Sequence, residues 1–255
     1  MVMPFMYQQP GLYSVNSLYY EAPPHSFKQI MLLAMGNARP TDFHAQHDAA
    51  DCFSAIMHII PNLSFLWHLQ DHAMKCESCN ASRSSSPPEA IARVAISNHQ
   101  RRHYIDAAGA IKDYFESAER GVNRDCPEAE CSGDRCTKST MLPMPSRFIV
   151  VKLLRFRATE NSAGKIDTEA KPFSSVEIET CQGICTYNVV ATVEHVGTRM
   201  EGGHYVAYIK QNDDWLLCDD HRITHLGVTT NEPTRNAYLV VLQTTELDDT
   251  SSPYA

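Results

Sequence analysis

The feature that most constrains the fold is a series of short apolar runs that begins after Pro145. The runs are rich in β-branched residues or alternate between apolar and polar residues, as strands do. Turn residues separate them, notably Gly202-Gly203 and the polar stretch 211–214, so successive strands fold back on one another. The pattern predicts an antiparallel β-meander with strands at residues 148–156, 187–196, 204–210, 215–219 and 237–242.

The first part of the chain has the apolar spacing of helices instead. Apolar residues recur every three or four positions in three stretches, each with a capping residue or a terminating proline at one end. Helices followed by strands indicate an α+β protein. We expect helices at 26–34, 42–60 and 106–120, a strand at 92–97, a loop at 82–88 and irregular structure at 1–25.

Composition excludes several classes of protein. The 255 residues can bury a sizeable core, and no apolar run approaches the ~20 residues that a membrane span needs. The first residues lack a basic stretch followed by an apolar one, so no signal peptide is expected. The net charge is −8 and no long basic stripe is present. We therefore expect neither a nucleic-acid nor a membrane partner, and a cytoplasmic or nuclear location.

The nine cysteines point to metal binding rather than to disulfides. An odd number without a signal peptide argues against a secreted disulfide framework. Cys76 and Cys79 form a C-x2-C knuckle, whose tight turn lets two thiolates bind one tetrahedral Zn²⁺. A second, irregular group follows at Cys126, Cys131 and Cys136. The two groups predict a structural zinc site, and the alternative is a degenerate, metal-free site with free thiols.

A histidine and two aspartates are the candidate catalytic residues. His204 follows Gly202-Gly203 at the mouth of one predicted strand, and Asp219-Asp220 end the next one. A hairpin between these strands brings the carboxylates back beside the imidazole, where a carboxylate fixes the tautomer and raises the basicity of a general base. The alternative is a structural histidine and two aspartates that cap a turn.

The sequence around this pair resembles the histidine box of ubiquitin-specific proteases. The match runs from His195 through Glu201-Gly-Gly-His204-Tyr205 to Asp219-Asp220. Residues 46–53, Gln-His-Asp-Ala-Ala-Asp-Cys-Phe, resemble the family's Q-Q-D-A-x-E-F helix, and residues 152–156, Lys-Leu-Leu-Arg-Phe, resemble its H-L-K-R-F strand. These enzymes are papain-like cysteine peptidases that remove ubiquitin from proteins.

The resemblance implies an α+β papain-like fold of the fingers–palm–thumb type, truncated at its N-terminus. The expected parts are a remnant of the helical thumb at 1–70, zinc-binding fingers at 71–145, a β palm with the histidine box at 146–243, and a disordered tail at 244–255. Ubiquitin or ubiquitinated proteins are the implied partners.

The resemblance also implies the roles of individual residues. His204 would be the general base, Asp219 its orienting partner and Asp220 the second choice for that role. Contacts to the C-terminal tail of ubiquitin would come from Asp48, Asp51, Gly203 and Tyr205. Structural zinc would be bound by Cys76, Cys79, Cys131 and Cys136, with Cys126 as the alternate ligand.

The nucleophile of the family has no counterpart in this sequence. A cysteine box of the type G-N-T-C-Y-x-N-S is expected well before the Q-Q-D-A helix, and its thiolate would attack the isopeptide carbonyl. The nearest echo lies around Asn16-Ser17, where the cysteine position holds Tyr13. Neither Cys52 nor Cys218 is an obvious substitute. We therefore expect that the 255-residue chain does not hydrolyse ubiquitin conjugates.

Three hypotheses remain. The chain is a fragment or truncated form of a thiol-dependent deubiquitinase that lacks the cysteine segment, or it is a catalytically inactive ubiquitin-binding or scaffold protein. The third possibility is a zinc-finger protein without any link to ubiquitin, for which the histidine box would be accidental.

Overall fold

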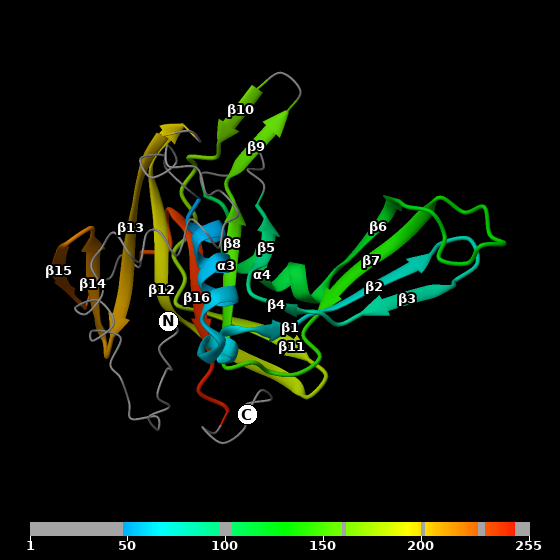
Figure 1. Ribbon diagram of the computed structural model, residues 1–255, viewed down its shortest axis with the longest axis horizontal. Coiled ribbons are helices and arrows are strands. Elements are labelled where there is room, and N and C mark those ends of the chain that lie inside the picture. The colour runs from blue at the N-terminus through cyan, green and yellow to red at the C-terminus, as the bar shows by residue number, and fades with distance from the viewer. Residues whose placement is uncertain (1–47, 97–103, 160–161, 200–201, 229–232, 248–255) are drawn as a thin grey trace, which may run out of the picture.

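Two β-sheets of different character organise the molecule. The computed structural model describes residues 48–96, 104–159, 162–199, 202–228 and 233–247. Figure 1 shows the larger sheet with a helix in front of it, and the smaller sheet extending away to one side. The larger sheet has eight strands. Their order is β15 (Arg222–Gly227), β14 (Asp214–Asp219), β13 (Gly202–Gln211), β12 (Gly183–Arg199), β16 (Ala237–Gln243), β8 (Phe148–Leu154) and β5 (Ala92–Ala95), and β11 (Ser175–Thr180) pairs with β12.

The larger sheet contains the predicted meander and adds to it. Strands β12 to β15 follow one another as antiparallel neighbours, and β16 returns to lie between β12 and β8. The pairing of β5 with β8 is parallel, so the sheet is mixed. All five predicted strands after Pro145 are present, whereas β11 and β15 were not predicted. Most side chains of β15 are exposed, so no apolar alternation marks it in the sequence.

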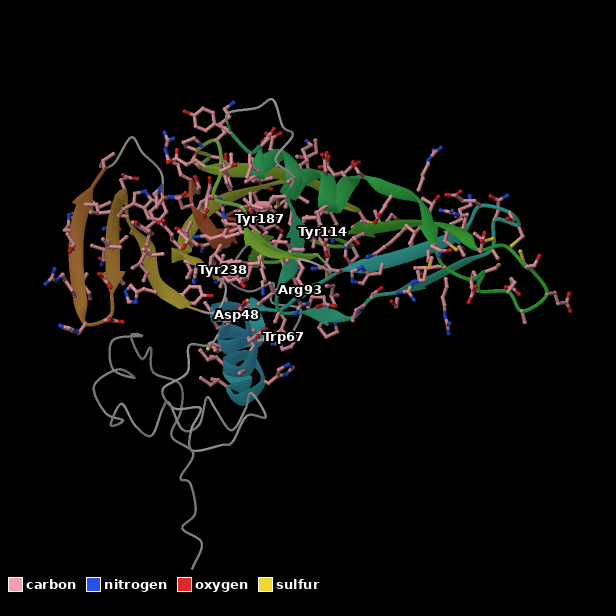
Figure 2. The ribbon with its side chains drawn as sticks, turned by 90° about the horizontal axis from the view of Figure 1, so that it is seen from above. Asp48, Trp67, Arg93, Tyr114, Tyr187 and Tyr238 are labelled. Carbon is pink, nitrogen blue, oxygen red and sulfur yellow. The ribbon has the colours of Figure 1, made fainter. Side chains whose placement is uncertain are left out.

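Helices cover the two faces of the larger sheet (Figure 2). Helix α3 (Ala49–Ile59) packs on one face, where Ala50 and Met57 meet Val150 and Leu239. Helix α4 (Ala107–Glu116) packs on the other face through Ile111 and Phe115, which join the larger apolar cluster. A sheet covered on both faces buries nearly every side chain of its central strands, which explains the continuous apolar run of β8.

The smaller sheet is mostly polar. Its four strands are β3 (Ser82–Ser85), β2 (Asp71–Cys76), β7 (Arg135–Met141) and β6 (Ala118–Asn123), in that order. Short elements connect the sheets or flank them: the 3-10 helix η2 (Pro61–Leu66), β1 (His68–Leu69) paired with β4 (Pro88–Glu89), and β9 (Phe156–Thr159) paired with β10 (Ser162–Lys165).

The smaller sheet corrects two expectations. Residues 82–88 were expected to form a loop, but β3 pairs with β2 along Ser82–Ser85. Backbone hydrogen bonds alone define this strand. All four of its side chains are exposed, so the sequence shows no apolar alternation there. The helix expected to run to residue 120 ends at Glu116, and Ala118 already begins β6.

The expected division into thumb, fingers and palm stays a prediction. Strand β5 and helix α4 fall within the range expected for the fingers but contribute to the core of the larger sheet. The helix expected at 26–34 and residues 42–47 of the next one lie outside the described residues, as do 1–25 and 248–255. Thr244, at the start of the expected tail, is buried. Within the described residues, no helix is long and apolar enough to cross a bilayer.

Candidate functional site

The pair His204 and Asp219 lies at the end of the β13–β14 hairpin. The register pairs Ala207 with Cys218, so Asp219 stands diagonally across from His204. Nε2 of His204 and Oδ1 of Asp219 are 2.5 Å apart. The contact expected from the sequence is therefore present, and the catalytic role of the two residues stays a prediction. Both side chains are partly exposed, at 42% and 45%, so a substrate can reach them.

The electrostatics of the pair suit proton transfer. The hydrogen bond that His204 donates to the carboxylate of Asp219 raises the pKa of His204 above its usual value, and the charge of Asp220 adds to the effect. Because Nε2 faces Asp219, the other ring nitrogen, Nδ1, is left to exchange a proton with a substrate or nucleophile.

Asp220 lies closer to the pair than strand alternation predicts. Alternation along a strand points successive side chains to opposite sides. The backbone of Asp220 has φ 51° and leaves the strand, so the alternation ends there. One oxygen from each aspartate and a ring nitrogen of His204 all lie within 4.8 Å of one another. Asp220 therefore lies beside the His204–Asp219 pair, and its role as the second choice for the orienting residue stays a prediction.

Gly203 packs directly on the ring of His195. A Cβ atom at Gly203 would lie 2.5 Å from Nε2 of His195 and 2.6 Å from the carbonyl oxygen of Val196, so no other residue fits. His195 is buried between the rings of Phe156 and Tyr205, at 5.3 and 4.9 Å between centroids. Burial and the nearby Lys165 lower the pKa of His195, so this imidazole is held neutral. This packing explains the glycine and does not test a contact with ubiquitin.

Lys165 fixes the end of β12 beside the candidate site, and the sequence analysis did not single it out. Its Nζ donates to the carbonyl oxygens of His195 and Gly197, at 2.7 and 2.6 Å. Gly197 has φ 140°, a conformation that favours glycine. The lysine therefore holds the chain where it turns toward His204. No local pattern in the sequence marks this lysine, because its partners are backbone carbonyls of a distant strand.

Asp48 joins helix α3 to the larger sheet. Its Oδ1 accepts from the backbone amides of Ala50 and Asp51, at 2.7 and 3.3 Å. Its Oδ2 accepts from Nζ of Lys152 at 3.2 Å and from the hydroxyl of Tyr238. Burial raises the pKa of Asp48, but the donors from Tyr238 and Lys152 outweigh it and hold the pKa below its usual value. Asp48 therefore caps the helix, and its contact with ubiquitin stays a prediction.

Asp51 and Tyr205 lie beside Asp48. Asp51 is exposed on the first turn of α3. Tyr205 is half-buried on β13, with its ring 5.8 Å from that of Tyr238. Burial and the charge of Asp48 raise the pKa of Tyr205 to about 12, so it is a neutral phenol. Three of the four residues expected to contact a ubiquitin tail thus lie where the start of α3 meets β13.

The cysteines form a four-sulfur site at the end of β2 and in the loop between β6 and β7. Sulfurs of Cys76, Cys79, Cys126 and Cys131 all lie within 4.8 Å of one another. Cys76 and Cys131 are 3.9 Å apart, and Cys79 and Cys126 are 3.4 Å apart. Sulfurs that bind one zinc tetrahedrally with bonds of ~2.3 Å stand about 3.8 Å apart. The backbone amides of Cys79 and Ser78 lower the pKa of Cys76 to about 6, which favours the thiolate that metals bind.

This geometry corrects the expected set of ligands. Cys136 was expected as the fourth ligand and Cys126 as the alternate, but Cys126 occupies the site. Cys136 lies opposite Cys76 in the β2–β7 ladder, is fully buried, and donates to the carbonyl oxygen of Arg124 at 3.4 Å. The loop after β6 folds back so that the amide of Cys126 donates to Gly133. Spacing alone does not reveal such a turn.

Cys218 and Cys52 lie on the elements that carry the candidate site, β14 and α3. Cys218 neighbours Asp219 on β14, but strand alternation points its side chain to the face opposite that of Asp219. Burial and the charges of Asp48 and Asp51 raise the pKa of Cys52, which disfavours its thiolate. Tyr13, Asn16 and Ser17 lie outside the described residues.

Comparisons with known proteins agree on one family. The sequence profile described as ubiquitin carboxyl-terminal hydrolase matches residues 12–241. Ubiquitin carboxyl-terminal hydrolase nonstop of Drosophila melanogaster is 42% identical over 60 residues, which are 23% of this chain and 12% of that protein. Ubiquitin carboxyl-terminal hydrolase 10 of Saccharomyces cerevisiae is 27% identical over 156 residues, which are 57% of this chain and 19% of that protein. The chain thus matches only a small part of these relatives.

Solved structures with the same fold include the SAGA Ubp8/Sgf11/Sus1/Sgf73 DUB module bound to ubiquitin aldehyde. The TM-score is 0.67 at 17% identity, and the match covers 88% of this chain and 55% of that one. The same module bound to monoubiquitin gives a TM-score of 0.66, with 88% and 54% covered. The α+β, papain-like fold expected from the histidine box is thereby confirmed.

Proposed function

Because the chain belongs to the ubiquitin carboxyl-terminal hydrolase family, we propose that it binds ubiquitin and carries the acid–base half of a thiol-dependent deubiquitinase site. The observation that carries this proposal is the 2.5 Å contact between His204 and Asp219 at an accessible strand end. The start of α3, with the exposed carboxylate of Asp51, supports a binding site for the ubiquitin tail beside it.

In the proposed chemistry His204 handles the proton. Its Nδ1 takes the proton of an attacking thiol, and the thiolate then adds to the isopeptide carbonyl. The same nitrogen returns the proton to the departing lysine amine, and water later releases ubiquitin from the thioester. Asp219 holds the ring through Nε2 and stabilises the imidazolium. The 255-residue sequence places no cysteine in a recognisable box, so we expect turnover only when a thiol is supplied.

A second candidate function is ubiquitin binding without hydrolysis. Its support is the alignment that puts Tyr13 at the nucleophile position, together with a family match that begins at residue 12. A phenol has an ordinary pKa near 10 and is a poor substitute for a thiol. Addition of a cysteine box to the N-terminus discriminates the two functions, because restored turnover requires a competent His204–Asp219 pair.

We also propose that Cys76, Cys79, Cys126 and Cys131 bind one structural zinc ion. Four thiolates in a closed tetrahedral set are typical of structural rather than catalytic zinc. The support is the mutual distance of the four sulfurs. Zinc at this place would tie β2 to the loop between β6 and β7.

Calorimetric titration with ubiquitin tests the binding proposal. We expect a one-to-one complex that is lost when the C-terminal tail of ubiquitin is removed. Asp51→Arg should weaken binding about fivefold, because it turns an attraction for the basic tail into a repulsion. Asp113→Arg on α4 is the matched control: it is exposed, changes the charge equally and lies on the opposite face. Tail-independent binding, or equal effects of both variants, would refute the proposed site.

A further inference from the structure

The carboxylate of Asp48 has no acceptor position left. An ionised carboxylate offers about four lone-pair positions. Two amides of the helix start occupy Oδ1, and Lys152 and Tyr238 occupy Oδ2. A basic side chain that arrives from outside finds an acceptor at Asp48 only by displacing one of these donors.

Among the donors to Asp48, Lys152 supplies a positive charge, as an incoming basic side chain would. It extends from β8 with its Nζ 3.2 Å from Oδ2 of Asp48 and 5.1 Å from the centre of the Tyr238 ring. Its side chain is 17% exposed, against 29% for Asp48, so the pair is partly shielded from water. Figure 2 shows Asp48 and Tyr238 where the start of α3 meets the sheet. The two amides and the phenol are neutral, so Lys152 alone neutralises the charge of Asp48 among these donors.

Asp51 has a different environment one turn along the same helix. Its side chain is exposed. Its backbone amide donates to Oδ1 of Asp48. Two carboxylates that look equivalent in the sequence are therefore unequal. One attracts a cation, and the other is already paired with a cation of the chain itself.

We propose that Lys152 is a specificity-determining residue that occupies the cation position at Asp48 and relaxes the requirement for a basic tail residue there. The inference rests on the proposed binding of ubiquitin beside α3. It also narrows the substrate class. The chain would accept C-terminal tails in which the residue that contacts Asp51 is basic, whereas the residue that contacts Asp48 is any small or polar one. An arriving guanidinium gains little, since one ion pair replaces another.

The test is a double-mutant cycle between Lys152→Gln and the basic residues of the ubiquitin tail. In the wild-type chain, alanine at the tail residue that reaches Asp48 should change the dissociation constant less than about twofold. In the Lys152→Gln variant, native ubiquitin should bind about two- to fivefold tighter, the same alanine should cancel this gain, and salt should weaken binding more steeply. The basic residue that meets Asp51 should matter equally in both chains.

Three further variants separate this role from a merely structural one. Lys152→Arg keeps a cation at Asp48 and should bind like the wild-type chain. Lys210→Gln removes an equal charge from an exposed position on β13 and should leave the cycle unchanged. Tyr238→Phe removes a donor but no charge, and should change affinity less than Lys152→Gln does.

The inference would be overturned if Lys152→Gln bound native ubiquitin with lower or unchanged affinity. It would also be overturned if Lys152→Gln bound the alanine-substituted ubiquitin more tightly by the same factor as native ubiquitin. Thermal unfolding of each variant shows whether α3 remains docked. If neither the wild-type chain nor any variant binds ubiquitin, the proposed function fails and the inference fails with it. If all bind but the cycle shows no coupling, only the inference fails.

Discussion

The two sheets of this molecule are built on different principles. The larger sheet buries Ile149, Val151 and Leu242 under α4 and Val150 and Leu239 under α3, so burial of apolar surface stabilises it. The smaller sheet consists of polar strands such as β3, whose side chains are all exposed. Its buried centre is Cys76 and Cys136, next to the other sulfurs. The comparison indicates that burial of apolar surface stabilises the larger sheet, whereas the smaller sheet depends on its four-sulfur cluster, the proposed zinc site.

Removal of zinc should have the largest effect and should be confined to the smaller sheet. Structural zinc contributes about 10–16 kcal/mol to the folding of small domains, and the strands around these sulfurs have little core to replace it. Cys126→Ser should therefore abolish zinc binding and the hydrogen-exchange protection of β2, β3, β6 and β7. The larger sheet should keep its protection.

Cys136→Ser is the matched control for this prediction. It changes an equally small thiol that lies outside the four-sulfur set, so zinc content should stay at one ion per chain. If Cys136→Ser lost zinc and Cys126→Ser retained it, Cys136 rather than Cys126 would be the fourth zinc ligand. Unfolding of the whole molecule on chelation would contradict the separation of the two sheets.

A cavity in the apolar core should have a smaller effect, on the other sheet. Phe115 is 2% exposed and packs from α4 into the larger cluster. Phe115→Ala should lower the free energy of unfolding by about 3–5 kcal/mol, because it removes buried surface and leaves a cavity. Chemical denaturation measures this, and zinc content should be unchanged. Tyr104→Ala, at a side chain that is 50% exposed, should cost much less.

The contrast between the two sheets also explains which strands could be predicted from the sequence. Strands β8, β12, β13, β14 and β16 were predicted from apolar runs or from apolar–polar alternation, because each has a buried side that selects apolar residues. The strands of the smaller sheet bury only Cys76, Cys136 and Thr140, and β15 buries no side chain, so no apolar pattern marks these strands and backbone pairing defines them instead. The same limit applies to Cys126, since a folded-back loop rather than spacing brings it to the site.

The candidate site was predictable to a similar degree. The polar turn at 211–214 joins the strand that follows Gly202-Gly203 to the strand that ends at Asp219, so His204 and Asp219 could be paired from the sequence alone. The contacts of Asp48 with Lys152 and Tyr238 join residues 104 and 190 positions apart, and no local pattern reports them. Lys165 was missed for the same reason, because its partners are backbone carbonyls of a distant strand.

The smallest effect we expect is on the titration of His204. Its pKa is raised in the folded chain by Asp219 and Asp220, so the pair stabilises the fold below the unfolded value near 6.5 and loses that contribution as the pH rises through the folded pKa. In an NMR titration the midpoint of His204 should lie above 6.5 and should fall in Asp219→Asn. An unchanged midpoint would show that Asp219 does not act on the imidazole.

The most direct test of the proposed function uses ubiquitin with a thiol-reactive group at its C-terminus. The 255-residue chain is incubated with this reagent, and intact mass is recorded after reversible binding has been measured under the same conditions. We predict a reversible one-to-one complex and no gain in mass, because the proposed acid–base pair His204 and Asp219 has no thiol positioned to attack. A covalent adduct that disappears in Cys52→Ala or Cys218→Ala would contradict this prediction and identify an unexpected nucleophile, and absence of any complex would contradict ubiquitin binding itself.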